Sequence, residues 1–200
     1  MSIAFDQSQT RLNLMRAFAG ESQARNRYTF AASLADKQHL HVVASAFRYT
    51  ADQEKEHAEV FYNLLAGLDG ETLHVDGGYP VNVSTSLNDL IKAARHNETE
   101  EWETVYPGFA RVARDEGFTR IGDTFAAIAE IERGHAVRFG QYIAALEEGT
   151  LFRAEEPVAW LCQNCGHIHI GVEAPKACSV CHHDQGYFIR LELSPFRLSL

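Results

Sequence analysis

Two Glu-x-x-His motifs, Glu54-x-x-His57 and Glu132-x-x-His135, interrupt helical patterns that are otherwise apolar. Around each motif the apolar residues recur at steps of three and four, which is typical of the buried face of an α-helix. Burying a carboxylate without a partner costs several kcal/mol, so each motif requires a partner inside the core. Because residues three apart on a helix point the same way, each Glu and His can bind one metal ion together.

The motifs belong to a crude internal repeat. Glu21 precedes the first motif by 33 residues, and Glu98 precedes the second by 34. Each half of the repeat is a helix pair that supplies one glutamate and one Glu-x-x-His, so two halves predict a four-helix bundle around a dimetal site. The expected helices cover residues 10–36, 38–68, 87–116 and 119–148.

The helix boundaries carry local signals. Ser86 is a candidate N-cap for the third helix, and Pro107 should bend or interrupt that helix. Gly117 and Gly149 should end the third and fourth helices. The connection before Ser86 contains several glycines and Pro80, and its length predicts that the chain crosses the bundle there.

The sequence pattern changes after Gly149. Short β-type runs replace the helical period, and all four cysteines form two Cys-x-x-Cys pairs separated by twelve residues. Two disulfides are the alternative, but nothing indicates export, and the spacing favours a tetrahedral metal site that suits iron as well as zinc. We therefore predict a bundle over residues 1–149 and a small metal domain over 150–200, its ligands being Cys162, Cys165, Cys178 and Cys181.

Hard carboxylate oxygens with one imidazole per metal favour iron or manganese in the bundle, and zinc less so. Glu101 lies one turn from Glu98 and is either a fifth ligand, used mainly in the oxidised state, or a solvated glutamate. Tyr28 and Tyr106 either donate an O–H to a ligand carboxylate or simply pack in the core.

Bulk properties exclude some classes of function. The net charge of −9 argues against a nucleic-acid partner. No apolar run approaches the roughly 20 residues that span a membrane, and the N-terminus lacks the pattern of a secretion signal. A cytoplasmic location is therefore expected.

These features together resemble the rubrerythrin family, in which a ferritin-like di-iron bundle with a long crossover precedes a small β-rich, rubredoxin-like domain. The resemblance covers about residues 10–192 and includes the sequences "YPGFA", "WLCQNCG" and "APKACSVC". Ser179 and His182 depart from simpler rubredoxin-like loops, and residues 193–200 have no counterpart that we can interpret. The site residues carried over are Glu21, Tyr28, Glu54, His57, Glu98, Glu101, Tyr106, Glu132, His135 and the four cysteines.

The resemblance implies a peroxidase that reduces hydrogen peroxide to water with two irons in the bundle and one iron at the cysteines. Glu101 and His57 would exchange on one iron as its redox state changes. Electrons would come from an NAD(P)H-dependent reductase or a rubredoxin, and the protein would be a homodimer or homotetramer.

Three other functions stay open at this point. The same site could serve a ferroxidase or an oxygen-reducing oxidase. The protein could instead store iron or carry electrons without being an enzyme. Finally, the cysteine domain could be a structural zinc ribbon.

Overall fold

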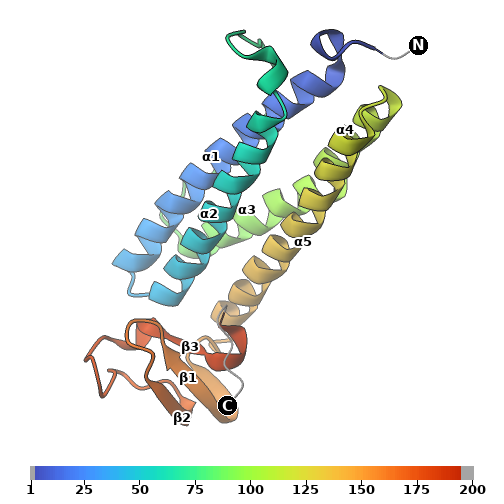
Figure 1. Cartoon of the computed structure of the whole chain (residues 1–200). Helices are drawn as coiled ribbons and strands as arrows, with labels where there is room; N and C mark the ends of the chain where they lie inside the picture. Colours follow the sequence, from blue (N-terminus) through green and yellow to red (C-terminus); the bar gives the residue numbers. More distant parts are fainter. Residues whose placement is uncertain (1–2, 195–200) are drawn as a thin grey trace.

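The computed structural model describes residues 3–194, and most of them form a helical bundle with a small β domain at one end (Figure 1). This confirms the mainly α architecture expected from the sequence. Helix α1 packs along α2, and α5 packs along both α3 and α4. In the described part of the chain, no helix is long and apolar enough to cross a membrane. The helices are α1 (Gln9–Lys37), α2 (His41–Asn63), α3 (Leu87–Glu100), α4 (Tyr106–Asp115) and α5 (Thr119–Glu147).

Local capping sets most helix ends. The Ser86 side chain accepts a hydrogen bond from the backbone N–H of Asp89 at the start of α3, as predicted. The second helix is shorter than expected, since it spans His41–Asn63 rather than residues 38–68. It starts late because His39 adopts a left-handed conformation with φ of 57°, which breaks the helical path. After α2 the chain turns and forms a 3₁₀ helix over Ala66–Leu68.

The third predicted helix is divided by a π-helical turn over Glu101–Val105, just before Pro107. Proline lacks an N–H and its ring crowds the preceding turn, so a wider turn accommodates it. Eight residues of regular α-helix would rotate Tyr106 about 80° away from Glu98. One extra residue shifts this rotation by about 100° in the opposite direction and leaves Tyr106 within about 20° of Glu98. The π-turn therefore returns Tyr106 to the face that carries Glu98.

The long connection between the two helix pairs crosses the bundle as predicted (Figure 1). Contacts with α1 hold it in place. Arg16 forms an ion pair with Asp76 at 2.6 Å. The Tyr79 hydroxyl donates a hydrogen bond to the backbone carbonyl of Arg16 at 3.0 Å. The connection brings the chain to α3 on the other side of the bundle.

Apolar side chains form two clusters inside the bundle. One contains Phe47 and Phe139, and the other contains Phe61 and Phe125. Along α2 and α5 the two Glu-x-x-His motifs lie between these clusters. The polar site is thus closed by apolar packing at both ends.

The small domain is a three-stranded antiparallel sheet in the order β2-β1-β3. Its fully buried centre is Trp160, whose indole N–H donates to the Gly171 carbonyl at 2.8 Å. Strand β1 ends at Cys162, so the sheet fixes the position of the first cysteine. The strands are β1 (Arg153–Cys162), β2 (Ile168–Glu173) and β3 (Phe188–Arg190).

The small domain lies against the turn between α1 and α2 (Figure 1). Its short 3₁₀ helix, Gln185–Tyr187, brings the Gly186 backbone against the backbone of His39. A Cβ atom at Gly186 would lie 1.9 Å from the His39 carbonyl oxygen, so no other residue fits without movement.

Gly186→Ala should therefore loosen the contact between the two parts of the chain. We expect faster proteolysis within residues 148–152, with little change in bundle helicity by circular dichroism. Gly134→Ala is the matched control, because a Cβ there meets nothing within 4 Å and alanine favours a helix by roughly 0.5–1 kcal/mol. Equal proteolysis of the two variants would contradict the close packing at Gly186.

Candidate metal centres

Four helices each bring a glutamate to the middle of the bundle, and two of them add a histidine. The ligand atoms form two groups, and within each group they lie within 4.8 Å of one another. Every member is buried, with exposed fractions between 0% and 7%. One group is Glu21, Glu54, His57 and Glu132, and the other is Glu54, Glu98, Glu132 and His135.

Glu54 and Glu132 belong to both groups, and each presents one oxygen to each histidine. His57 Nδ1 lies 3.2 Å from Glu54 Oε2 and 3.0 Å from Glu132 Oε1. His135 Nδ1 lies 3.1 Å from Glu54 Oε1 and 2.7 Å from Glu132 Oε2. The two imidazole rings are nearly parallel, with centroids 5.8 Å apart. With this arrangement, the two motif glutamates would help to hold two metal ions at once.

Several of these oxygens accept no well-aligned hydrogen bond among the described residues, although a histidine nitrogen lies close to three of them. They are Oε2 of Glu21, Oε1 of Glu54 and both side-chain oxygens of Glu132, and all are buried. Buried carboxylate oxygens that are not fully hydrogen-bonded are costly, and cations compensate their charge. The residues present therefore fit a pair of metal ions, and the oxygen-rich donor set with one imidazole each fits iron or manganese.

Tyr28 and Tyr106 contact the two glutamates that are not shared. The Tyr28 hydroxyl donates to Glu98, and the Tyr106 hydroxyl donates to Glu21. Tyr28 follows Glu21 by seven residues, and Tyr106 follows Glu98 by eight, the difference being the extra residue of the π-turn. Of the two roles open from the sequence, the structure shows the hydrogen bond to a carboxylate for both tyrosines.

Glu101 lies beside both groups but belongs to neither. It starts the π-turn and is half-buried, unlike the fully buried glutamates. Burial raises its pKa well above the usual carboxyl value, and the charges of Glu98, Glu132 and Glu54 add to this effect. Glu101 is thus close enough to interact electrostatically with both groups.

The metal-free site has strongly perturbed pKa values. Burial alone would lower the pKa of both histidines, but close contacts with Glu132 and Glu54 outweigh it. They raise the pKa of His57 to about 9 and that of His135 to about 12. Burial raises the pKa of Glu21 well above its usual value, and repulsion from the same two glutamates raises it further.

Metal-free protein should accordingly lose stability as pH rises from 6 to 9. Each histidine whose pKa is raised in the folded state contributes stability that is fully present below about pH 6.5. That stability is lost as the pH rises through the folded-state pKa. The raised pKa of Glu21 acts in the same direction, because the folded state favours its neutral form. For His57 alone the loss is on the order of 3 kcal/mol. Thermal unfolding of chelator-treated protein checks this, and a melting temperature that rises over this range would contradict it.

Gln53 is a neighbour of the site that the sequence pattern does not reveal. His135 Nε2 lies 3.1 Å from Gln53 Oε1, so the amide can fix the ring with Nδ1 directed at the carboxylates. Arg138 contacts Gln53 and donates to Thr50 at 2.9 Å. Gln53 directly precedes Glu54 and does not lie on the apolar face of α2. Its contact with His135 is therefore visible only from the way α5 packs against α2.

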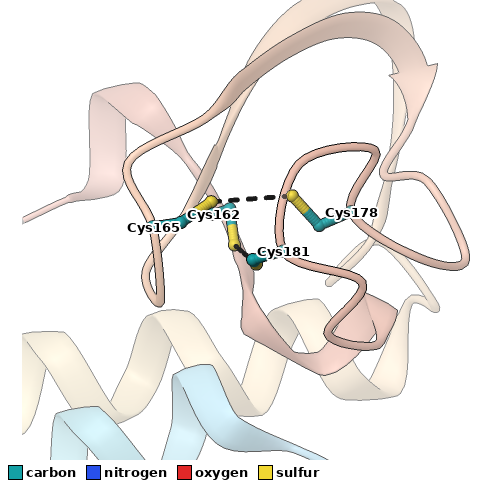
Figure 2. A group of neighbouring side chains, drawn as sticks. All are labelled: Cys162, Cys165, Cys178 and Cys181. Atoms are coloured by element: carbon teal, nitrogen blue, oxygen red, sulfur yellow. Dashed lines mark hydrogen bonds between the residues drawn. The ribbon is translucent and has the colours of Figure 1, made fainter.

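The four cysteines of the small domain point toward a common centre (Figure 2). Cys162 and Cys181 have sulfur atoms 3.7 Å apart, as do Cys165 and Cys178. These separations are far longer than a disulfide bond of about 2.05 Å, and all four thiols are free. All four sulfurs lie within 4.8 Å of one another, which fits one tetrahedral metal ion.

Two similar loops hold the cysteines. The backbone N–H of Gly166 donates to the Cys162 carbonyl at 2.8 Å, and that of His182 donates to the Cys178 carbonyl at 3.0 Å. Both donors adopt positive φ, 78° and 61° respectively, so His182 occupies the position that glycine fills in the first loop. The backbone N–H of His183 lowers the pKa of Cys181 to about 5, which favours the metal-binding thiolate.

Comparison with known proteins agrees with both parts of this description. The family model described as "Rubrerythrin" matches residues 13–143. A second model, "Rubrerythrin, rubredoxin-like domain", matches residues 160–189 and so includes all four cysteines.

Whole-chain relatives carry the same name. The chain is 42% identical to a rubrerythrin of Porphyromonas gingivalis over 90% of its own length and 89% of the relative's. It is 38% identical to a rubrerythrin of Nitratidesulfovibrio vulgaris, covering 90% and 93% of the two chains. Among solved structures, partially reduced nigerythrin aligns with a TM-score of 0.62 at 26% identity, over 94% and 92% of the chains.

A bacterioferritin of Desulfovibrio desulfuricans aligns with a TM-score of 0.63 at 21% identity, over 71% of this chain and 82% of the other. That likeness concerns the fold alone and confirms the ferritin-like bundle. The two family models, the relatives and the two clusters of metal-binding side chains lead to one conclusion. The chain belongs to the rubrerythrin family of di-iron, ferritin-like oxidoreductases with a rubredoxin-like domain.

Proposed function

We propose that this protein is a peroxidase that reduces hydrogen peroxide to water at a non-haem di-iron site in residues 1–149. The sharing of Glu54 and Glu132 between two ligand groups is the observation that carries the proposal. When bound there, two ferrous ions supply two electrons, which with two protons convert one H₂O₂ into two waters. Residues 150–200 would hold one further iron at the four cysteines.

The protein residues would hold the ions and manage charge and protons. Glu21 and His57 would complete one ion's ligands, and Glu98 and His135 would complete the other's. Glu101 would approach as positive charge on the ions increases, in exchange for His57. The raised pKa of Glu101, caused by burial and then by the neighbouring carboxylates, favours its neutral form when fewer cations are present.

The tyrosines would orient the unshared ligands. A hydroxyl that donates to Glu98 or Glu21 fixes the direction of that carboxylate's oxygens. Burial raises the pKa of both phenols well above 10, and the facing glutamates raise it further, so both keep their protons near neutral pH. They therefore act as steady donors within a site from which apolar clusters exclude bulk water.

The presence of the small domain with its four cysteines favours an enzyme that needs a repeated supply of electrons over the alternative functions. A ferroxidase or an iron store takes electrons from incoming ferrous iron and needs no relay. A Cys₄ iron beside the bundle would pass single electrons from an NAD(P)H-dependent reductase or a rubredoxin. We further propose a homodimer or homotetramer as the working assembly.

Metal content and substrate preference test this proposal together. Protein purified with care for iron should hold three irons per chain, with the colour of a Cys₄ ferric centre. Steady-state turnover with peroxide should exceed turnover with oxygen at equal concentration. Faster turnover with oxygen would favour an oxygen-reducing oxidase on the same site. Only zinc at the cysteines, in protein from its native cell, would rule out the relay.

A further inference from the structure

A third cluster of metal-binding side chains lies where the small domain meets the α1–α2 turn, away from both centres described above. It contains His39 and His41 from the bundle and Asp184 from the small domain. One ligand atom from each residue lies within 4.8 Å of the other two. The sequence gives no hint of this cluster, because 143 positions separate His41 from Asp184.

His41 is held as metal-binding histidines usually are. Its Nδ1 lies 2.9 Å from Asp36 Oδ1, so the ring donates its proton there and leaves the lone pair of Nε2 free. Arg48 pairs with the other oxygen of Asp36 and keeps that carboxylate ionised. The imidazole also stacks on Tyr187 with ring centroids 4.0 Å apart, which fixes its plane. Nε2 is thereby directed toward the small domain.

Asp184 presents one oxygen to both imidazoles. Its Oδ1 accepts the backbone N–H of Gly186 at 2.9 Å and so is already used. Its Oδ2 lies 2.9 Å from His39 Nδ1 and 3.7 Å from His41 Nε2. Ligand atoms about 2.0–2.2 Å from a tetrahedral zinc ion are roughly 3.3–3.6 Å apart. Small side-chain movements would therefore bring all three atoms to bonding distance.

We propose that His39, His41 and Asp184 bind a divalent transition-metal ion of the zinc class, which fastens the small domain to the bundle. Two imidazoles and one carboxylate leave a fourth position for water, as in other three-ligand zinc sites. The ion would join the α1–α2 turn to the segment that follows Cys181. It would restrict the motion of the small domain relative to the bundle without taking part in its redox chemistry.

Zinc binding to the iron-loaded, full-length protein tests the proposal. The protein is dialysed against zinc chloride, metals per chain are counted, and the visible spectrum verifies that the cysteine iron stays in place. Wild type should take up one zinc more than His39→Asn, which tolerates the left-handed backbone but lacks the imidazole. Asp184→Asn, which keeps the Gly186 contact, should also lose this zinc. The exposed His96→Ala is the matched control and should retain it.

Two further measurements separate a metal site from a network of hydrogen bonds. Asp36→Asn should weaken zinc binding about 10- to 100-fold, because Asp36 orients His41 without touching the ion. Zinc should slow amide hydrogen exchange at residues 38–41 and 184–187 in wild type but not in Asp184→Asn. Equal zinc uptake by wild type, His39→Asn and Asp184→Asn would overturn the proposal, as would zinc-independent exchange in wild type.

Discussion

Glu54→Ala should lose the bundle iron and reduce peroxide turnover by more than about 100-fold, while the colour of the cysteine centre remains. Glu54 presents an oxygen to each histidine, so its loss affects both ions at once. Changes in residues that merely orient metal ligands already cost about 10- to 100-fold, and a bridging ligand should cost more. Glu132→Ala should behave the same way, because its two oxygens occupy the equivalent positions.

Glu59→Ala is the matched control, since Glu59 is an exposed glutamate on the same helix. It should keep its iron and its turnover. Iron per chain and the visible spectrum are measured beside the peroxide rate, so loss of metal is distinguished from loss of fold. Wild-type turnover in Glu54→Ala would remove the basis for a bridged di-iron site.

Replacing Cys162 and Cys165 together by serine should separate single from repeated turnover. The bundle has its own apolar clusters and a complete ligand set, so it should still bind two irons. Once chemically reduced, this variant should consume about one peroxide per chain, because the two irons hold two electrons. Repeated turnover with a reductase and a nicotinamide donor should collapse, since the buried site lacks its relay.

Val180→Ala, at an exposed position in the second cysteine loop, should cycle like wild type and serves as the control. If the double serine variant also cycles at the wild-type rate, the cysteine site is structural and the zinc-ribbon interpretation is favoured.

The same variant can show which subunit delivers the electrons. The double serine chain is mixed with a chain in which Glu54 and Glu132 are both alanine. Neither chain alone should turn over repeatedly. Recovered turnover in the mixed assembly would mean that the cysteine centre of one subunit serves the bundle of another, whereas no recovery would mean delivery within one chain.

The sequence alone determined the parts of this protein whose chemistry depends on short spacings. A helix places residues three apart on one face. The spacing alone therefore identifies two ligand pairs, Glu54 with His57 and Glu132 with His135. The two Cys-x-x-Cys pairs are recognisable for the same reason. The mainly α bundle followed from periodicity, and the internal repeat indicated that four helices converge.

Only the tertiary structure decided features that depend on how separate elements approach one another. The structure showed that, in each shared glutamate, one side-chain oxygen faces His57 and the other faces His135. It also showed that Glu101 lies outside the two ligand groups. The π-turn that brings Tyr106 back to the site arises from crowding near Pro107 and has no simple sequence period. Gln53 and the cluster at Asp184 likewise depend on contacts between distant segments. Local spacing fixes what lies on one helix face, whereas packing decides which faces meet.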